Sequence, residues 1–465
     1  MQPLFLEVST LDSAAVELFG MSHELLMENA ARSLAELIRA RFRAGSVVRI
    51  VSGPGNNGAD GIALARMLWG DYRVRLWLPL GCASDLAKLQ LRRAQALGVE
   101  GVEKLGQGDV LVDALFGSGL SRDLGLDSLE VIREMNEARG YKIACDIPSG
   151  IDSKGNPRPI AFKADLTCAM GAIREALLSD STKEFVGELV VGNLGISQRL
   201  YEQNQPPSAY LLGREDVRLP WRVREDSHKG SYGHLAVVAG EREGAAVLAA
   251  LAGLHFGAGL VSLVGEVKNP PYELMQGVSV PEGASALACG MGLGKRECPK
   301  EAWELPSVLD ADILGREEIR SLLEKNPSLV LTPHPKEFAN LLGVLGIAQV
   351  SALEVQKDRM GWARIFGERY PRAVLLLKGA NPVILQGERL YINPLGGAML
   401  AKGGSGDVLS GIIASLLAQG RSPLESAIEG SLAHTLAASR VEKANYALTP
   451  LDLVQALGKL SLGTL

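Results

Sequence analysis

The chain has 465 residues, of which 22% are charged, and its formal net charge is only −5. Because this length exceeds the size at which a single hydrophobic core stops growing, we expect two domains of roughly 200 to 250 residues each. The sequence has no basic block and no acidic tail, which argues against nucleic-acid binding and against binding to a membrane surface.

The first half of the chain repeats a strand, turn and helix pattern. Leu and Ala at helical spacing predict helix over residues 10–42, and VVRIVSG at 47–53 predicts an apolar strand that ends in glycine. Several of the runs that follow are apolar through their centres, as expected for parallel strands buried on both faces. The alternation predicts an α/β domain. These runs are RVRLWLPL (73–80), DVLVDALFGSG (109–119), YKIACDIPSG (141–150) and ADLTCAMG (164–171).

A polar, proline-bearing stretch over residues 203–226 has no periodicity, and we place a domain junction there. This gives two predicted domains, residues 1–210 and residues 211–465. After the junction the strand and helix pattern restarts, so the second half is also predicted to be a layered α/β domain. Its predicted strands are GHLAVVAG (233–240), GLVSLVG (259–265), a run near SALACGMGLG (285–294), SLVLTPH (328–334) and AVLLLKGA (373–380).

Three features bear on where the protein works. Residues 244–265 carry no formal charge over a length that could cross a bilayer, but His255 and the break at Gly257 and Gly259 favour a buried helix that leads into a strand. The N-terminus lacks the basic region of a signal peptide. The five cysteines form no C-x-x-C pair and leave one over in any disulfide scheme. We therefore expect reduced thiols in a cytoplasmic protein with no membrane partner.

The segment GPGNNGADG, residues 53–61, lies between the first apolar strand and the predicted helix IALARMLWG. Glycines there allow a sharp turn and expose backbone N–H groups at a helix start, an arrangement that holds phosphate in α/β folds. The segment is not a complete G-x-G-x-x-G and it lacks a Walker lysine. A tight turn with a helix cap explains the glycines equally well.

Two aspartates strengthen the case for a ligand site in the first half. Asp113 and Asp146 each sit at the carboxyl end of a predicted strand, where open α/β sheets bind their ligands. Burying an unpaired carboxylate is costly, although a cap or turn explains either residue alone equally well. Together with Asn57 and Ser149 they offer the oxygen ligands that a hard cation prefers.

Four motifs in this order resemble the NAD(P)H-hydrate epimerase family, a Rossmann-like three-layer domain also called the YjeF N-terminal domain. They are LMENAARSLAELI, GPGNNGADGIALAR, VDALFGSGL and CDIPSGID, and the resemblance covers nearly all of residues 1–200. One departure is Ala59, where the family usually has glycine.

This resemblance implies a set of functional residues in the first domain. Asp146 would be the acid/base near the epimerised carbon, and Asn57, Asp113 and Ser149 would hold a potassium ion. Two segments would bind the hydrated nucleotide. They are Asn56, Asn57, Gly58, Ala59 and Asp60, and a phosphate-side loop of Gly117, Ser118, Gly119, Leu120, Ser121, Arg122 and Asp123.

The stretch LAKGGSGDVLSGIIASLLAQG, residues 400–420, places four glycines and serines before an aspartate where an apolar helix begins. Such a segment supplies N–H donors at a helix N-terminus for a transferred phosphoryl group. Asp407 is then placed to take a proton from a substrate hydroxyl group. The alternative is that Ser405 caps the helix and Asp407 favours its dipole, but one small residue suffices for that. The number of small residues favours the catalytic interpretation.

Other polar residues of the second half leave two interpretations open. His334, between two prolines, is either a ligand contact or a packed loop histidine. Lys378, at the end of a predicted strand, either binds phosphate or marks a sheet edge. Asp310 and Asp312 end another predicted strand and either orient a metal or lie behind the site.

The second half resembles the ADP- or ATP-dependent NAD(P)H-hydrate dehydratase family, the YjeF C-terminal domain, of ribokinase-like fold. The resemblance spans roughly residues 215–460 and rests on HKGSYGHLAVVAG, LTPHPKEFANLLG, LLLKGANPVI and NPLGGAMLAKGGSGDVLSG. It departs from the family in the short loop VVAGEREGAA and in Lys402, where a small polar residue is common.

By this resemblance Asp407 is the catalytic base, and His334 and Gly292 contact the hydrated nicotinamide nucleotide. ADP or ATP would bind with magnesium, and ADP is the expected donor. The residues implied for the adenine nucleotide are Lys378, Gly379, Ala380, Asn381, Pro382 and Gly406.

Together the two resemblances imply a fused enzyme that repairs NADH or NADPH after water has added across the nicotinamide 5,6 double bond. The first domain would interconvert the R and S hydrates, and the second would phosphorylate the S hydrate and eliminate phosphate. We expect a homo-oligomer with small-molecule substrates. Two alternatives stay open: a ribokinase-like vitamin-precursor kinase, which has no use for GPGNNGADG and CDIPSGID, and a first domain that only binds its ligand.

Overall fold

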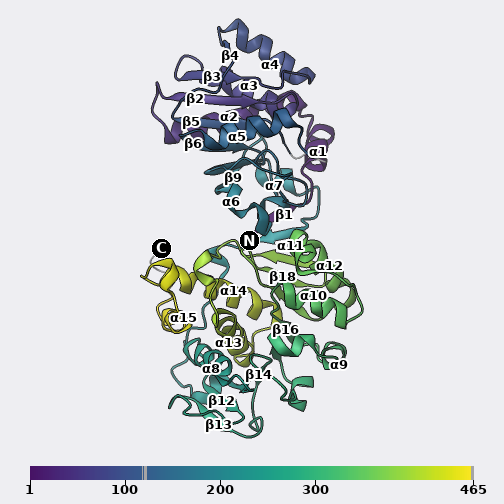
Figure 1. Ribbon diagram of the computed structural model, residues 1–465, viewed down its shortest axis with the longest axis vertical. Coiled ribbons are helices and arrows are strands. Elements are labelled where there is room, and N and C mark those ends of the chain that lie inside the picture. The colour runs from purple at the N-terminus through teal and green to yellow at the C-terminus, as the bar shows by residue number, and fades with distance from the viewer. Residues whose placement is uncertain (118, 120–122, 462–465) are drawn as a thin grey trace. The chain divides into compact units, whose positions relative to one another are not determined.

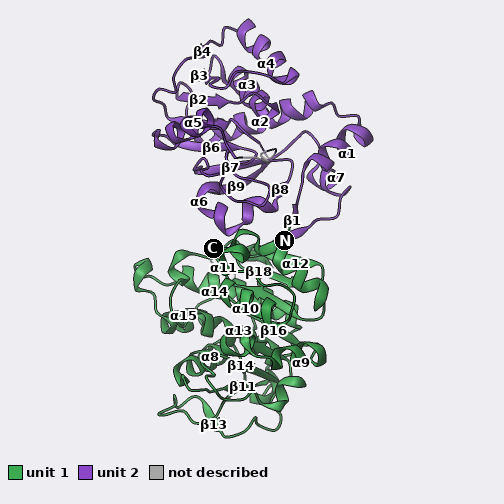
Figure 2. Ribbon diagram, turned by 45° about the vertical axis from the view of Figure 1, so that its right-hand side comes forward, with its two compact units in different colours: residues 1–2, 210–465 green, residues 3–209 purple. Residues whose placement is uncertain are grey.

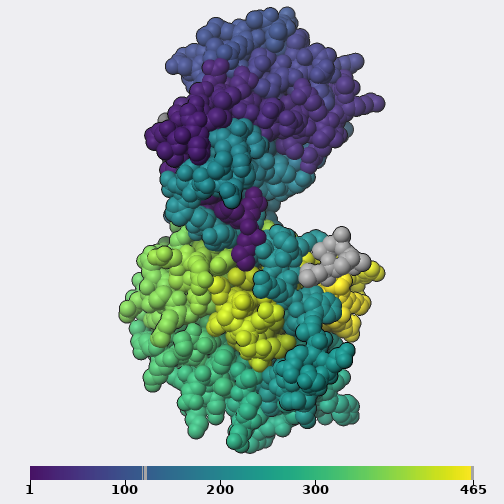
Figure 3. Space-filling view, turned by 180° about the vertical axis from the view of Figure 1, so that it is seen from behind, coloured from purple at the N-terminus to yellow at the C-terminus, as the bar shows by residue number. Residues whose placement is uncertain are grey.

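The computed structural model describes residues 1–117, 119 and 123–461 (Figure 1). The chain divides into two compact units (Figure 2). The N-terminal unit is residues 3–209, and the C-terminal unit is residues 210–465 together with residues 1–2. The space-filling view shows the dark purple N-terminal residues at the molecular surface (Figure 3).

The N-terminal unit contains a sheet of seven parallel strands. Its elements are β1 (Gln2–Phe5), α1 (Ser9–Phe19), α2 (His23–Arg41), β2 (Val47–Ser52), α3 (Asn56–Leu68), β3 (Arg73–Trp77), α4 (Asp85–Ala96), β4 (Gly101–Val102), β5 (Val110–Ala114), α5 (Leu126–Glu137), β6 (Tyr141–Cys145), β7 (Leu166–Met170), β8 (Ile173–Arg174), α6 (Lys183–Val186), β9 (Glu188–Gly192) and α7 (Gln198–Glu202). The strand order is β4-β3-β2-β5-β6-β7-β9. Strands β1 and β8 pair in parallel with each other and do not belong to this seven-stranded sheet.

Apolar side chains cover both faces of this sheet. In β5, Val110 and Val112 pack into one buried cluster with α1 to α4, whereas Leu111 packs into a second cluster with α5. Successive side chains of a strand point to opposite faces, so a strand with no polar alternation needs a layer on each side. The result is a three-layer α/β unit.

The C-terminal unit is built on a larger sheet. Its elements are β10 (Ala209–Leu211), β11 (His234–Val238), α8 (Glu243–His255), β12 (Leu260–Val264), β13 (Met275–Gly277), β14 (Ala286–Cys289), β15 (Ser307–Leu309), α9 (Glu318–Lys325), β16 (Leu329–Leu331), α10 (Pro335–Val344), α11 (Ala352–Lys357), α12 (Arg359–Arg369), β17 (Val374–Leu377), β18 (Val383–Gln386), β19 (Arg389–Ile392), α13 (Ser405–Ala418), α14 (Pro423–Ser439) and α15 (Pro450–Leu457). Strands β13-β12-β11-β14-β15-β16-β17 are parallel neighbours, and β18 and β19 extend the sheet in antiparallel fashion.

Helix α13 lies at the centre of this unit. Every residue from Val408 to Ala418 is buried, as expected for a helix that is apolar on all sides. Gly411 allows α13 to approach α8 closely, because a Cβ atom there would lie 2.0 Å from the backbone oxygen of Ala249. The helix is therefore enclosed by neighbours along its length.

The predicted α/β class is confirmed in both units, with two differences in detail. The predicted loop over residues 53–61 is wrong, because α3 already begins at Asn56. Gly58 makes this possible by letting the first turn of α3 pack on the end of β2, where a Cβ atom would lie 1.9 Å from the oxygen of Gly53. The hairpin of β18 and β19 was not predicted.

The apolar segment of residues 244–265 forms α8 followed by β12, as the sequence predicted. Within the described part of the chain, no helix is both long enough and apolar enough to cross a membrane.

Candidate active sites

A cavity of about 600 Å³ lies in the N-terminal unit. It forms where the carboxyl ends of β5 and β6 meet the start of α3, the position at which open α/β sheets bind ligands. Apolar side chains of α2 and several charged groups complete its wall. The polar residues that line it are Asp12, His23, Asn56, Asn57, Asp60, Asp146 and Arg174.

Asp146 follows β6 directly and is fixed by an ion pair. Its Oδ1 atom accepts a hydrogen bond from Arg174 Nη1 at 2.5 Å, and both side chains are largely buried. The backbone of Asp146 is in the left-handed region, with φ of 70°. Such a conformation costs about 1–3 kcal/mol and is found most often at functional sites. The fold thus holds this carboxylate in one defined place in the cavity wall.

Two further acids in the cavity hold their protons more tightly than usual. Burial raises the pKa of Asp60 well above its ordinary value, and the negative charges of Asp146 and Asp12 raise it further. The Cys145 thiol lies 3.8 Å from Asp60 Oδ2. Burial also raises the pKa of Asp12, against a hydrogen bond from the Tyr201 hydroxyl that lowers it. A site that combines an ion-paired carboxylate with acids of raised pKa suits acid/base chemistry.

Asp113 and Ser149, predicted as cation ligands, are in direct contact. Ser149 Oγ donates to Asp113 Oδ1 at 2.6 Å, and the Ser149 amide donates to Oδ2 at 2.8 Å. Burial raises the pKa of Asp113 to about 6. Asn57 lies nearby. The Phe116 amide donates to Ser149 Oγ, and the next residue, Gly117, is close to Asn57, since a Cβ atom on Gly117 would lie 3.4 Å from Asn57 Cβ.

The remaining residues predicted to bind substrate in this unit differ in position. Asn56, Asn57, Asp60, Gly117 and Gly119 line the cavity. Gly58 and Ala59 are buried in the packing of α3 instead. Asp123 is exposed, and its Oδ1 atom lies 3.9 Å from Arg158. The predicted residues Ser118, Leu120, Ser121 and Arg122 lie outside the described part of the chain.

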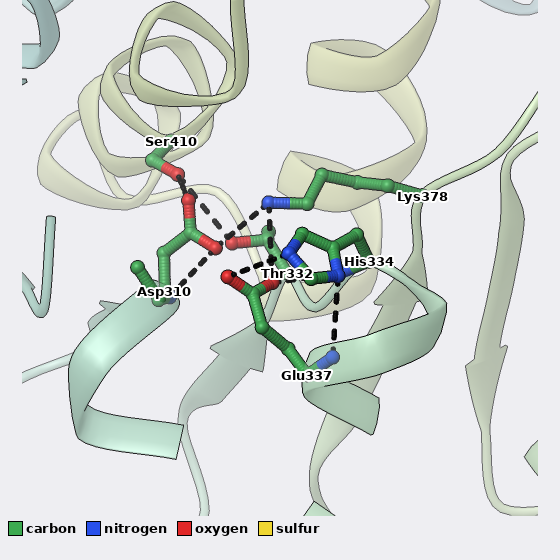
Figure 4. A network of polar contacts seen from close by, with 7 residues as sticks. Asp310, Thr332, His334, Glu337, Lys378 and Ser410 are labelled. Atoms are coloured by element: carbon green, nitrogen blue, oxygen red, sulfur yellow. Dashed lines mark hydrogen bonds and ion pairs between the residues drawn. The ribbon is translucent and has the colours of Figure 1, made fainter. Parts of the chain in front are cut away.

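A second site lies in the C-terminal unit, where polar side chains follow three neighbouring strands (Figure 4). Asp310 follows β15, Thr332 follows β16 and Lys378 follows β17. Lys378 Nζ donates to Asp310 Oδ1 at 2.9 Å, and Ser410 of α13 donates to Asp310 Oδ2 at 2.9 Å. Glu337, in the first turn of α10, lies 3.8 Å from Lys378 Nζ. Asp310 therefore holds the lysine in place.

Asp407 lies in the first turn of α13, beside this network. Burial raises the pKa of Asp407 to about 6, and the negative charges of Asp310 and Glu337 act in the same direction, against Lys378. Burial acts to lower the pKa of Lys378, but the surrounding carboxylates raise it overall. A Cβ atom on Gly406 would lie 3.3 Å from Lys378 Nζ. The helix N-terminus, a lysine and a carboxylate that titrates near neutrality thus meet at one place.

The glycine segment before α13 differs from a simple cap. The cap position is Gly404, with φ of 89°, and no side chain caps the helix. Ser405 is the first helical residue, and its Oγ atom lies 3.1 Å from His434 Nε2 of α14. Burial lowers the pKa of His434 to about 4, so the imidazole is neutral. The interpretation of Ser405 as the helix cap is therefore wrong.

Replacing Gly404 with Ala is expected to destabilise the C-terminal unit by about 1–3 kcal/mol. The left-handed backbone disfavours a side chain, and the new Cβ atom would lie 2.6 Å from Pro450 and 3.0 Å from Leu248. Gly403→Ala is the matched control, because nothing lies within 4 Å of a Cβ atom there. Thermal unfolding of both variants measures the effect, and equal transition temperatures would contradict the expectation.

The other predicted residues of the second site lie in three separate segments. His334 is exposed and caps α10, accepting a hydrogen bond from the Glu337 amide at 3.2 Å, so the structure gives it a role in helix capping. Gly292 lies on the loop after β14, and its carbonyl accepts from Arg242 at the start of α8. The segment Lys378–Pro382 follows β17; Gly379 and Ala380 are exposed, whereas Asn381 and Pro382 are buried.

Sequence profiles of two protein families match the chain. The profile described as YjeF-related protein N-terminus matches residues 23–176, and that described as NAD(P)H-hydrate dehydratase matches residues 235–459. A protein of Helicobacter pylori named bifunctional NAD(P)H-hydrate repair enzyme Nnr is 43% identical to this chain, with 99% of this chain and 100% of that protein aligned. The chain belongs to this family.

Further members of the bifunctional NAD(P)H-hydrate repair enzyme family are similar over almost the same length. The Coxiella burnetii protein of that name is 34% identical, with 93% of each chain covered. Among solved structures, the ADP/ATP-dependent NAD(P)H-hydrate dehydratase of Bacillus subtilis, co-crystallised with ATP and Mg²⁺, is 28% identical. That likeness covers 54% of this chain and 97% of the other, with a TM-score of 0.46. The resemblance indicated by the motifs is confirmed for both halves of the chain.

Several residues of the two sites in this repair enzyme were not predicted from the sequence. Arg174 and Tyr201 reach Asp146 and Asp12 only through the fold. An arginine in an otherwise apolar stretch after a predicted strand was the available signal for Arg174. Arg359 is buried and donates to the backbone oxygens of Asn381 and Leu377, which fixes the Lys378–Pro382 segment, and no local pattern marks it.

Proposed function

We propose that this protein repairs hydrated NADH and NADPH in two steps. Residues 1–210 interconvert the R and S hydrates, and residues 211–465 dehydrate the S hydrate at the expense of ADP or ATP. The observation that carries the proposal is the meeting of Asp407, Lys378 and the N-terminus of α13 in a chain whose other unit holds a separate acid-lined cavity. Family membership supports both assignments.

The dehydration is a phosphorylation followed by an elimination. Asp407 takes the proton from the hydroxyl group of the S hydrate while that oxygen attacks the terminal phosphoryl group of the nucleotide. Backbone N–H groups at the start of α13 and the Lys378 ammonium stabilise the negative charge that develops. Phosphate then leaves with a proton from the neighbouring carbon, which restores the double bond. Hydroxide is a much poorer leaving group than phosphate, which explains the need for a nucleotide.

The residues around the second site bear on how magnesium binds. Among the described residues, no three His, Cys, Asp or Glu side chains are grouped so as to hold a metal ion. We infer that Mg²⁺ would be held mainly by the phosphates of the nucleotide, where it would supply positive charge that offsets part of theirs. Lys378–Pro382 and Gly406 would bind the nucleotide, and His334 and Gly292 the nicotinamide part.

The residues around Asp113 fit a potassium ion. Asp113 and Ser149 present oxygen atoms, which suit a hard cation, and a buried carboxylate whose pKa is about 6 would be stabilised in its ionised form by a positive charge. We assign Asn57, Asp113 and Ser149 to this ion, which would order the substrate-binding wall formed by residues 115–117.

In the first unit, Asp146 is assigned as the acid/base of epimerisation, with Asn56 to Asp60 and Gly117 to Asp123 as substrate contacts. The ion pair with Arg174 orients this carboxylate toward the cavity that would hold the nicotinamide ring. We further propose that the protein works in the cytoplasm as a homo-oligomer, with small molecules as its only substrates.

One experiment tests the proposal as a whole. Purified protein is incubated with hydrated NADH, magnesium, and either ADP or ATP, and the return of NADH absorbance is followed. We expect both epimers to be consumed, and the faster nucleotide identifies the donor. Turnover of hydroxymethylpyrimidine or hydroxyethylthiazole in place of the hydrate would favour the vitamin-precursor kinase. Consumption of the S epimer alone, with no R-to-S conversion, would leave the first unit as a binding module.

The dehydration rate is expected to fall as the pH drops below about 6. Asp407 acts in its ionised form, and its pKa is raised to about 6. The fraction of enzyme with an ionised Asp407 is therefore largest well above this pH and decreases as the pH falls through it. The pH dependence of kcat/KM with pure S hydrate measures the effect. A rate constant that stays level well below pH 6 would contradict the assignment of Asp407 as the base.

A further inference from the structure

Asp12 lines the same cavity as Asp146 but comes from a different part of the chain. It lies in α1, which follows β1, and β1 pairs in parallel with β8 through Phe5 and Arg174. Because Arg174 is the ion-pair partner of Asp146, this pairing brings α1 close to that ion pair. The cavity thus receives carboxyl groups from two separate elements, one at a strand end and one on a helix.

The two carboxyl groups have different partners. Asp146 is paired with a guanidinium group, whereas Asp12 Oδ1 accepts a hydrogen bond from the neutral Tyr201 hydroxyl group at 2.7 Å. The Tyr201 side chain is only 2% exposed, so it holds Asp12 firmly. Burial raises the pKa of Asp12, and the negative charge of Asp146 raises it further. Neighbouring acids that differ in this way commonly serve as an acid and a base.

Epimerisation requires proton transfer on both sides of the reacting carbon. In one direction, a protonated carboxyl group donates to the hydroxyl group, the C–O bond breaks, and water leaves. The lone pair of the ring nitrogen forms a C=N bond to the same carbon. Water then adds from the other side, and an ionised carboxylate takes its proton. One proton has passed from one carboxyl group to the other, and only water is exchanged, so the step needs no oxidant, reductant or further reactant.

We propose that Asp12 is a second catalytic residue of the epimerisation, which exchanges a proton with the departing or entering water on one side of the ring while Asp146 does so on the other. This inference rests on the proposed epimerase function of the N-terminal unit. Asp60 is the third acid of the cavity, but its hydrogen-bond partner is the buried Cys145 thiol. Burial raises the pKa of Asp60 well above its ordinary value, and the negative charges of Asp146 and Asp12 act in the same direction.

The test is the rate of R-to-S conversion by the full chain without any nucleotide, followed by chromatography and corrected for the uncatalysed rate. Asp12→Asn is expected to lower this rate by about 10²–10⁴-fold, the usual contribution of a positioned acid or base. Glu17→Gln, an exposed change on the same helix, is the matched control and should keep the wild-type rate. Thermal unfolding shows whether the N-terminal unit of the Asp12 variant is folded, and unchanged nucleotide-dependent dehydration of S hydrate shows that the C-terminal unit is intact.

An Asp12→Asn protein that converts R to S hydrate within a few-fold of the wild-type rate would overturn the inference while leaving the epimerase function intact. A wild-type protein that does not interconvert the hydrates would instead overturn the proposed function. The two failures are therefore distinguishable.

Tyr201→Phe gives a second readout that a structural role of Asp12 would not change. The hydrogen bond from the Tyr201 phenol lowers the pKa of Asp12. Its loss should therefore raise this pKa and move the limb of the pH–rate profile of epimerisation that reports Asp12 to higher pH. An unchanged profile would count against Asp12. The other ionisable groups that act on this position are Asp60 of α3, His23 of α2, Asp146 after β6 and Arg174 of β8.

Discussion

Asp407→Asn is expected to abolish nucleotide-dependent dehydration, with kcat lowered by about 10²–10⁴-fold. The amide has nearly the shape of the carboxylate but cannot accept the hydroxyl proton of the S hydrate. Asp407 stands in the first turn of α13, and its neighbours Asp310 and Lys378 are held by each other and by Ser410. The substitution should therefore leave the surrounding geometry and the affinity for ADP close to those of the wild type.

Recovery of NADH absorbance with pure S hydrate measures this loss, and calorimetric titration with ADP and magnesium measures binding. Glu354→Gln is a suitable control, because Glu354 is an exposed acid in the first turn of another helix of the same unit, α11. R-to-S conversion should be unchanged in both variants. If Asp407→Asn keeps a dehydration rate near that of the wild type, the base is another group.

Asp146→Asn is expected to lower the rate of R-to-S conversion by about 10²–10⁴-fold and to leave dehydration of S hydrate unaffected. Asparagine is the informative replacement for two reasons. It tolerates the left-handed backbone at φ of 70°, which most residues do not. It can also keep a hydrogen bond to Arg174 while losing the ability to take up a proton.

Chromatographic separation of the two epimers over time, without nucleotide, measures the effect. Asp85→Asn, an exposed change at the start of α4, serves as the control for this unit. With a mixture of both epimers and ADP, the Asp146 variant should stop after the S hydrate has been consumed, apart from the slow uncatalysed conversion. Full consumption at the wild-type rate would show that Asp146 is not required.

The sequence predicted most of the framework, because its signals are local. Apolar runs closed by turn residues located the main parallel strands, and Asp113, Asp146, Asp310 and Lys378 do stand at strand ends. The predicted loop over residues 53–61, which was wrong, also rested on a local signal. Gly53 and Gly58 looked like loop glycines. Gly58 instead lets α3 pack on the end of β2, and Gly53 lets the chain pass close to the backbone of Leu115 after β5, a partner that is distant in the sequence.

The parts of the sites that escaped prediction depend on contacts between distant segments. Tyr201 meets Asp12 across 189 positions of sequence, and Ser410 meets Asp310 across 100. Arg359 fixes the Lys378–Pro382 segment by donating to backbone oxygens. Every residue type has such an oxygen, so the contact cannot be predicted from the residues that accept the hydrogen bonds. A few motifs thus predict which polar residues stand at strand ends, but not the groups that orient their side chains.

The enclosure of α13 has a consequence for how the second site operates. Gly411 packs against the backbone of Ala249 on one side of this helix, and α14 packs on the other, so we expect the helix to stay in place when a nucleotide binds. In the proposed mechanism, its terminal amides are therefore preorganised, and little reorganisation energy is needed as charge builds up on the phosphoryl oxygens. Adaptation to a different phosphoryl donor would have to come from the exposed Gly379 and Ala380 instead, which makes that short turn the place to begin a search for variants with altered nucleotide preference.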